Sequence, residues 1–226
     1  RPADTSRPVP VLVQLHGGGG HGTVEYALTL AKLLGAAVLS LDWGGEPFTP
    51  GEPCPEHVTR WRYPPPGKGG ILGKEAACYH VVIAVRRALD FLSQQPGVDM
   101  SKVVLYGGSW GSFHAHLVAG VEPRVTDVVG HAGAGGWSDS YAICAYGIHS
   151  LPAEQRQEFL ATFDPISYAP FTHADVTMLA PTNDDYFWFG GLQRHFLALA
   201  NRERKRLVIQ PNSDHAIGGY PNPVPT

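Results

Sequence analysis

Short apolar runs rich in β-branched residues alternate along this chain with longer segments whose apolar residues repeat at helical spacing. The apolar runs lie at 11–15, 37–41, 103–106, 125–129, 176–179 and 207–210. The helical segments lie between them, at 23–34, 74–94, 111–119 and 191–201. Most runs are apolar at successive positions, which is typical of strands that helices cover on both faces. The alternation predicts an α/β fold with a mostly parallel central sheet flanked by helices.

Size and charge narrow the classes of function. The 226 residues suit one domain, so we expect a single domain over 1–226. Charged residues make up only 16% and the net charge is −3, which provides no basic surface for nucleic acid. No run reaches the roughly 18 apolar residues of a membrane span. The compartment stays open between secreted and cytoplasmic, with secretion slightly favoured.

Two long connections interrupt the alternation. Residues 43–73 are rich in Pro and Gly, and 133–170 separate two strands by far more than one crossover helix needs. Such long connections in a compact domain are usually lids, binding loops or oligomer contacts. We expect both to border one site at the carboxyl ends of the strands, with 133–170 as an insertion that forms a lid.

The segment Gly107-Gly108-Ser109-Trp110-Gly111 directly follows one strand and opens a helical segment. This Gly-x-Ser-x-Gly arrangement is typical of a nucleophile elbow, in which the outer glycines permit a tight turn that exposes the serine hydroxyl. A serine hydroxyl is a weak nucleophile and needs a base that a third group orients. The pattern therefore predicts Ser109 as a nucleophile with a histidine and an acid elsewhere.

The two partners are expected in loops after later strands, in the chain order serine, acid, histidine. The strand near 176–180 is followed by Asp184 and Asp185, and the last strand is followed by Asp214 and His215. We predict His215 as the base. Asp184 is favoured as the acid over Asp185, which stays as the alternative, while Asp214 is expected to shape the histidine turn.

A glycine run, His16-Gly17-Gly18-Gly19-Gly20-His21-Gly22, lies between the first strand and its helix. Glycines let backbone N–H groups approach a developing negative charge without obstruction by Cβ atoms. We assign the oxyanion hole to the N–H of Trp110 and that of Gly18 or Gly19. The same run matches a dinucleotide fingerprint from Gly17 to Gly22 with Asp42 as the ribose-binding acid, so a dinucleotide-binding oxidoreductase is the alternative.

Aromatic residues accompany these loops. Tyr186, Trp188 and Trp137 are predicted to bind the substrate, with core packing as the alternative role for each. Trp110, beside the predicted nucleophile, is a further candidate for contacting a planar or sugar-like substrate. No CxxC or HExxH occurs, so neither a zinc ribbon nor a metalloprotease site is predicted. Cys54 and Cys78 are the pair to test for a disulfide, against three buried free thiols.

Four stretches, HGGGG at 16–20, GGSWG at 107–111, TNDDYFW at 182–188 and NSDHA at 212–216, resemble the α/β-hydrolase superfamily. The chain is similar to its dienelactone-hydrolase and acetyl-xylan-esterase-like groups, and TNDDYF also resembles PhoPQ-activated pathogenicity-related proteins. The resemblance implies a serine carboxylic ester hydrolase without a cofactor. The few charges in the expected rim favour a small neutral or carbohydrate-linked ester, with a serine peptidase as the alternative.

The chain departs from the superfamily at both ends. Only about eight residues precede the first parallel strand, and 216–226 are rich in Pro and Gly where the family has a terminal helix. We therefore expect a version of the fold with shortened termini. Without a terminal helix an apolar sheet face would be exposed, which favours a homo-oligomer.

Overall fold

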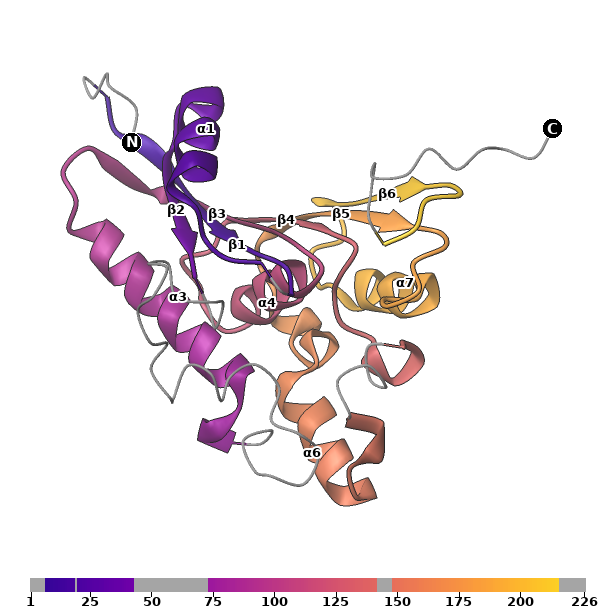
Figure 1. Ribbon diagram of the computed structural model, residues 1–226. Coiled ribbons are helices and arrows are strands. Elements are labelled where there is room, and N and C mark those ends of the chain that lie inside the picture. Colours follow the sequence, from indigo (N-terminus) through magenta and orange to yellow (C-terminus); the bar gives the residue numbers. More distant parts are fainter. Residues whose placement is uncertain (1–6, 19, 43–72, 142–147, 216–226) are drawn as a thin grey trace, which may run out of the picture.

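A six-stranded sheet forms the centre of the computed structural model, which describes residues 7–18, 20–42, 73–141 and 148–215. The strand order is β2-β1-β3-β4-β5-β6 and every neighbouring pair is parallel (Figure 1). The strands are β1 (Val9–Leu15), β2 (Ala37–Leu41), β3 (Val98–Gly108), β4 (Asp127–His131), β5 (Asp175–Pro181) and β6 (Lys205–Gln210). The predicted α/β fold with a parallel sheet is confirmed.

Helices cover the two faces of the sheet unequally. Helix α1 lies on one side, whereas α3, α4 and α7 lie on the other (Figure 1). The α-helices are α1 (Val24–Leu34), α3 (Ala77–Ser93), α4 (Trp110–Ala119), α6 (Ala153–Phe163) and α7 (Phe189–Ala198). Short 3₁₀ turns are η1 (Gly73–Glu75), η2 (Trp137–Asp139), η3 (Ile148–Ser150), η4 (Pro165–Ser167) and η5 (Ala169–Phe171). Among the described residues, α1 is thus the only helix on its face.

Helix α1 shows how local sequence sets the element ends. The Thr23 hydroxyl accepts the N–H of Tyr26 as an N-cap, and Gly35 closes the helix with a left-handed φ of 62°. Most of its apolar side chains are not enclosed: Leu33 is 75% exposed and only Ala31 is buried in this helix. Helix α1 packs against β2, which lies at the end of the strand order.

The main core lies between the sheet and the layer of α3, α4 and α7. All ten residues of α4 are buried, because this helix packs against the central strands β1, β3 and β4. Phe113, Leu105, Val128 and Met178 are each at most 1% exposed in this cluster. Burial of such side chains stabilises by about 2 kcal/mol each. The helix that begins directly after Ser109 is therefore buried along its whole length.

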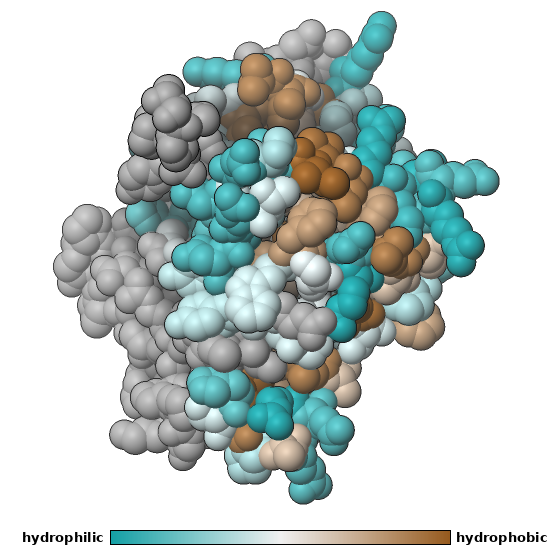
Figure 2. Space-filling model, turned by 90° about the vertical axis from the view of Figure 1, so that its right-hand side faces the viewer, coloured by the Kyte–Doolittle hydropathy of each residue, from teal (hydrophilic) through white to brown (hydrophobic). Residues whose placement is uncertain are grey.

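The opposite face and the β6 edge carry more exposed apolar surface. A cavity of ≈ 510 Å³ lies between α1 and the sheet, lined by Leu30, Leu34, Val104, Tyr106 and Val129 among others. The β6 residues Val208 and Ile209 are 44% and 51% exposed. On the side of the molecule where β6 and α7 lie, brown side chains form a band bordered by teal ones (Figure 2). In the described part of the chain, β6 is thus less covered than the central strands of the sheet.

The predicted insertion at 133–170 is packed into the molecule. The buried carboxylate of Asp164 accepts the backbone N–H groups of Gly136 and Trp137 at 2.9 and 2.8 Å. Phe159 and Phe163 of α6 are both 4% exposed and belong to the main core. These hydrogen bonds join two parts of the segment to each other, and the apolar contacts of Phe159 and Phe163 join it to the main core.

Cys78 is a free thiol in α3 with 4% exposure, and burial raises its pKa to about 12. Its suggested disulfide partner Cys54 lies outside the described residues, as does most of the 43–73 connection. Across the residues that the structure describes, no helix has both the length and the apolar character needed to cross a bilayer.

Candidate active site

Ser109 occupies a tight turn between β3 and α4. Its φ of 54° and ψ of −120° are unusual for a residue with a Cβ atom, and such strain is characteristic of functional sites. A Cβ on Gly107 would lie 2.5 Å from the Gly111 carbonyl carbon, and one on Gly111 would overlap the Leu15 carbonyl. Glycine is therefore required at positions 107 and 111, because the two sides of the turn contact each other and Gly111 contacts the end of β1.

His215 contacts both of its predicted partners. Its Nε2 lies 2.9 Å from Ser109 Oγ, and its Nδ1 lies 2.9 Å from Asp184 Oδ2 and 3.0 Å from Oδ1. The structure thus brings together three side chains from three separate loops, although His215 and Ser109 are 106 positions apart. Asp185, the alternative acid, has an exposed side chain.

The Asp184 carboxylate is fixed by its own loop. Its Oδ1 accepts the backbone N–H groups of Tyr186 and Phe187, each at 2.8 Å, and the residue is 5% exposed. The loop is also joined to the histidine loop, since Asn183 N donates to Ser213 O at 2.9 Å and Asn212 N to the Thr182 hydroxyl at 2.8 Å. Strands β5 and β6 pair side by side, so their following loops meet and present the acid to the imidazole.

The glycine run lies directly against the serine turn. A Cβ on Gly17 would sit 3.5 Å from the Ser109 Cβ and 3.4 Å from Gly108 O. Gly18 follows it in an exposed position, whereas Gly19 lies outside the described residues. Trp110 opens α4, so its backbone N–H lies at the N-terminus of this helix, directly after Ser109. Two of the predicted oxyanion donors therefore lie on segments that border Ser109.

Asp42, the expected ribose-binding acid of the dinucleotide alternative, contacts a histidine side chain. Asp42 Oδ1 lies 3.3 Å from Nε2 of the buried His16, and His16 Nδ1 donates to Gly17 O at 2.7 Å. Thr23 already caps the first turn of α1, where a pyrophosphate would have to bind. Burial lowers the pKa of His16, while its contacts with Gly17 and Asp42 act in the opposite direction. The residues that suggested a nucleotide are thus engaged with one another.

Aromatic rings border the His215 side of the site. The Tyr186 ring lies 4.9 Å from the imidazole, is 38% exposed, and meets the Tyr141 ring edge-on at 6.2 Å. Trp188 is 50% exposed. Tyr141 was missed by sequence reasoning, because nothing in its neighbourhood along the chain distinguishes it. It belongs to the 133–170 insertion, which therefore contributes a side chain beside the site.

Trp137 and the Trp110 ring are core residues. Trp137 has no exposed surface, its Nε1 donates to Ala134 O at 3.2 Å, and its ring packs against Phe113, Phe159 and Phe187. Trp110 is 4% exposed and packs edge-on against Trp137. The expectation that Trp137 binds the substrate is corrected, because a fully enclosed ring offers no surface to one.

His131 is a second histidine near the site that the sequence did not indicate. It ends β4, and its carbonyl accepts the N–H of Ser109 at 2.9 Å. A Cβ on Gly108 would overlap its ring, so the imidazole lies against the backbone beside the nucleophile. Burial, with a smaller effect of His215, lowers the pKa of His131. This keeps a second positive charge away from His215.

No group of three His, Cys, Asp or Glu side chains within the described ranges is arranged to hold a metal ion. Ser109, His215 and Asp184 offer a serine hydroxyl, an imidazole and a carboxylate in sequence. Such an arrangement can transfer an acyl group through the serine oxygen.

Comparisons with known proteins agree with the fold. The family model for the alpha/beta hydrolase fold matches residues 10–196, while a search of curated proteins found no match. Similar solved structures include an acetyl xylan esterase from Paenibacillus sp. R4, at 24% identity and a TM-score of 0.74, covering 92% of this chain and 69% of that one. Acetyl Xylan Esterase 1 from Thermoanaerobacterium sp. JW/SL YS485 has 17% identity and a TM-score of 0.68, with coverages of 93% and 70%.

A puromycin-hydrolyzing peptidase from Mycobacterium tuberculosis is also similar, with 15% identity and a TM-score of 0.71. It covers 93% of this chain, but this chain spans only 31% of the peptidase. Identities this low establish a shared fold and leave the substrate open. The parallel sheet, the serine turn after β3 and the match over 10–196 together show that the chain belongs to the α/β hydrolase fold family.

Proposed function

We propose that this protein is a serine hydrolase that cleaves carboxylic esters through an acyl-enzyme intermediate. Ser109 is the nucleophile, His215 the general base and acid, and Asp184 the group that orients the imidazole. One observation carries the proposal: the pair of 2.9 Å contacts that join Ser109 Oγ to His215 Nε2 and His215 Nδ1 to Asp184 Oδ2.

The contacts support one direction of proton transfer. The Asp184 carboxylate accepts a hydrogen bond from His215 Nδ1–H, which leaves a lone pair on Nε2 facing the Ser109 hydroxyl. As Oγ attacks the ester carbonyl, its proton moves to Nε2, and the resulting imidazolium then protonates the departing alcohol. A water molecule next gives its proton to Nε2 and attacks the acyl carbon, which releases the carboxylic acid and restores Ser109.

The oxyanion formed in each step needs donors that are already in place. We propose the backbone N–H groups of Trp110 and of Gly18 or Gly19 for this role. Support comes from the position of Trp110 at the start of α4 and from the packing of Gly17 against the Ser109 Cβ. Removing one such donor costs about 10²–10³ in kcat in a comparable enzyme.

The proposed substrate is a small neutral or carbohydrate-linked ester. Two exposed rings, Tyr186 beside His215 and Tyr141 next to it, offer apolar faces on which a sugar ring can stack. Trp188, two positions after Tyr186, is a further exposed aromatic residue in this part of the chain. Two of the similar structures are acetyl xylan esterases, which is consistent with such a substrate. We further propose that the 133–170 insertion forms one rim of the site, since it carries Tyr141.

A peptidase on the same fold is the second candidate, because a similar solved structure is a puromycin-hydrolyzing peptidase. The same three side chains could attack an amide. The two functions differ in leaving group and are separated by comparing matched ester and amide substrates with the same acyl group. A higher kcat/KM for the amide would replace the ester proposal with the peptidase.

Labelling with a fluorophosphonate and mapping of the adduct by mass spectrometry tests the mechanism. We expect the adduct on Ser109 and loss of ester hydrolysis in Ser109→Ala. Ser101→Ala, at an exposed serine of β3, is the matched control and should retain both. Labelling elsewhere, or an active Ser109→Ala variant, would contradict the proposal. A panel of acetyl, longer acyl and sugar acetate esters then defines the substrate.

A further inference from the structure

The ring of His16 bridges two segments beside the serine turn. Its Nδ1 donates to Gly17 O at 2.7 Å, and its Nε2 lies 3.3 Å from Asp42 Oδ1. The imidazole is buried, with only 6% of the side chain exposed, whereas the Asp42 side chain is 30% exposed. A buried polar ring between two acceptors at these distances is held in one orientation, because any rotation would break both contacts.

The Gly17 carbonyl is the point that this ring holds. It accepts the Gly20 N–H at 3.1 Å as well as the His16 Nδ1–H, which closes a turn over 17–20. In a trans peptide the carbonyl and the following N–H point in opposite directions. The N–H of Gly18 is therefore directed away from the His16 ring. The preceding residue, Gly17, packs against Ser109 Cβ, so this N–H lies on the segment nearest the nucleophile.

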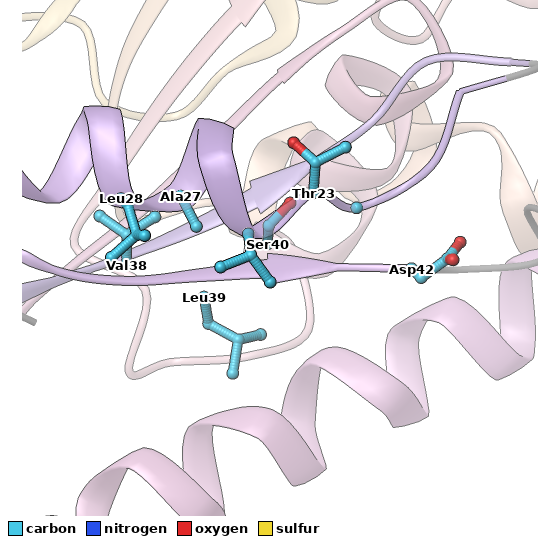
Figure 3. Close-up of a pocket in the computed structure, with 9 residues that line it drawn as sticks. Thr23, Ala27, Leu28, Val38, Leu39, Ser40 and Asp42 are labelled. Atoms are coloured by element: carbon cyan, nitrogen blue, oxygen red, sulfur yellow. The ribbon is translucent and has the colours of Figure 1, made fainter. Parts of the chain in front are cut away.

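Asp42 is itself well placed to hold the ring. It directly follows β2, which pairs in register with β1 up to Leu15 and Leu41. The Ser40 hydroxyl donates to the Gln14 side chain, and a Cβ on Gly22 would lie 3.2 Å from Asp42 N. In Figure 3, Ser40 lies on β2 and Asp42 directly follows its carboxyl end, and both line the same pocket as Leu28 and Val38. The carboxylate thus stands at a rigid strand end.

We propose that His16, held by Asp42, is a positioning residue that orients the Gly17–Gly18 peptide so that the Gly18 N–H serves the oxyanion hole. The inference rests on the proposed serine hydrolase mechanism and adds to it a pair of side chains that touch no substrate. In this arrangement the end of β2, rather than the glycine run itself, sets the direction of the donor. A run of glycines has little preference for any one backbone conformation, so contacts from outside the run are needed to hold the Gly17–Gly18 peptide.

The protons on the ring agree with this role. The Gly17 carbonyl oxygen can only accept, so the 2.7 Å contact needs a proton on Nδ1. Nε2 donates to the Asp42 carboxylate when the imidazole carries both protons, and this carboxylate favours that form against the effect of burial. The other charged or titratable groups that act on this ring are His21 on the glycine run and His114 on α4, and protonation of either would oppose a charge on His16.

Four variants test the inference through kcat and KM for p-nitrophenyl acetate. His16→Ala should lower kcat by about tenfold or more, with KM changed less than about threefold, because a lost oxyanion donor acts mainly on the transition state. His16→Asn should recover much of the loss, since its amide can reach the Gly17 carbonyl. Asp42→Ala should lower kcat, whereas Asp42→Asn should stay close to wild type, because an amide can still bond to Nε2. Asp175→Ala is the control at an acid with similar exposure, 34%, in an exposed ion pair with Arg204.

Hydrogen exchange at the Gly20 amide adds a readout that does not depend on catalysis. The Gly20 N–H donates to Gly17 O, so His16→Ala should speed its exchange while amides in β3 keep their wild-type rates. The inference is overturned if His16→Ala keeps the wild-type kcat and Gly20 exchange, or if His16→Asn is no better than His16→Ala. Failure of the proposed function would look different: Ser109 would escape the fluorophosphonate in the wild-type protein, while Gly20 exchange would still respond to His16→Ala.

Discussion

Lowering the pH from about 7 to about 5 should destabilise this protein through three buried histidines. His114 and His116 of α4 and His195 of α7 are each 1% exposed. Burial lowers the pKa of His114 to about 3 and that of His116 to about 4, and the pKa of His195 lies well below its usual value. The rings of His116 and His195 are neighbours, with two of their nitrogens 3.2 Å apart. The two imidazoles therefore cannot both carry a positive charge. All three are therefore neutral in the folded protein.

The sign and size of the change in the free energy of unfolding follow from the difference between the folded and unfolded pKa values. The folded pKa values lie below the unfolded value near 6.5, so this stability is fully present above about pH 6.5 and is lost as the pH falls towards the folded values. Between about pH 7 and about pH 5 each histidine should reduce the free energy of unfolding by about 2 kcal/mol, or about 6 kcal/mol for the three. The free energy of unfolding of a protein domain is about 5–15 kcal/mol in total, so unfolding should begin near about pH 5.

Two carboxyl groups titrate differently from these histidines. Burial raises the pKa of Asp164, so its uptake of a proton in the folded state adds stability as the pH falls. Hydrogen bonds from the Arg124 side chain lower the pKa of Glu122 to about 2. The stability from Glu122 is therefore present above its unfolded pKa and is lost only below about pH 4.5. The loss between about pH 7 and about pH 5 is thus assigned to histidines, chiefly the three most buried ones, with His16 and His131 acting in the same direction because burial also lowers their pKa values.

Urea unfolding followed by circular dichroism at several pH values measures this slope. His114→Phe keeps an aromatic ring stacked on Trp110, whose centroid is 5.2 Å away, but removes one titrating group. Its slope should be smaller than the wild-type slope by about 1.4 kcal/mol per pH unit below about pH 6. His173→Gln, at an exposed histidine, should keep the wild-type slope. A wild-type free energy of unfolding that stays constant over this range would refute the reasoning, as would an unchanged slope in His114→Phe.

Two further comparisons use matched pairs of variants. Asp184→Asn should lower kcat by about 10⁴-fold, because the amide favours the wrong imidazole tautomer. Asp185→Asn is the control and should leave ester hydrolysis intact. Equal losses of kcat in the two variants would contradict the role of Asp184. Gly111→Ala should lower the melting temperature sharply, since its Cβ would overlap the Leu15 carbonyl. Gly190→Ala should raise the melting temperature slightly, because no atom lies within 4 Å of the new Cβ. A thermal melt that gives the opposite order of the two variants would contradict this packing.

The sheet could be predicted because each strand is a compact apolar run, and the predicted range 37–41 matches β2. Helix α6 was missed because the repeat in its sequence is weak, with Phe159 and Phe163 its only buried residues. The burial of Trp137 was also missed, since a sequence shows that a residue is aromatic but not which neighbours enclose it. Lateral contacts such as that of His16 with Asp42 are hidden for the same reason.

The meeting of the three loops could be anticipated from topology. Parallel strands end at one edge of the sheet, so residues that directly follow β3, β5 and β6 are brought to a common place. The choice between Asp184 and Asp185 depended on a finer feature, the turn that directs one carboxylate inward onto the Tyr186 and Phe187 amides. Such a turn depends on backbone hydrogen bonds that residue type alone does not specify.

His215 depends on the least protected strand of the sheet. It follows β6, which pairs only with β5 at the end of the strand order and leaves Val208 and Ile209 about half exposed. Edge strands of this kind fray at free energies below that of global unfolding. Fraying of β6 would withdraw the imidazole from Ser109 while the core beneath α4 stayed intact. Catalytic competence would then be lost at milder denaturant concentrations than secondary structure, which makes the terminal strand the element that limits the working lifetime of the protein.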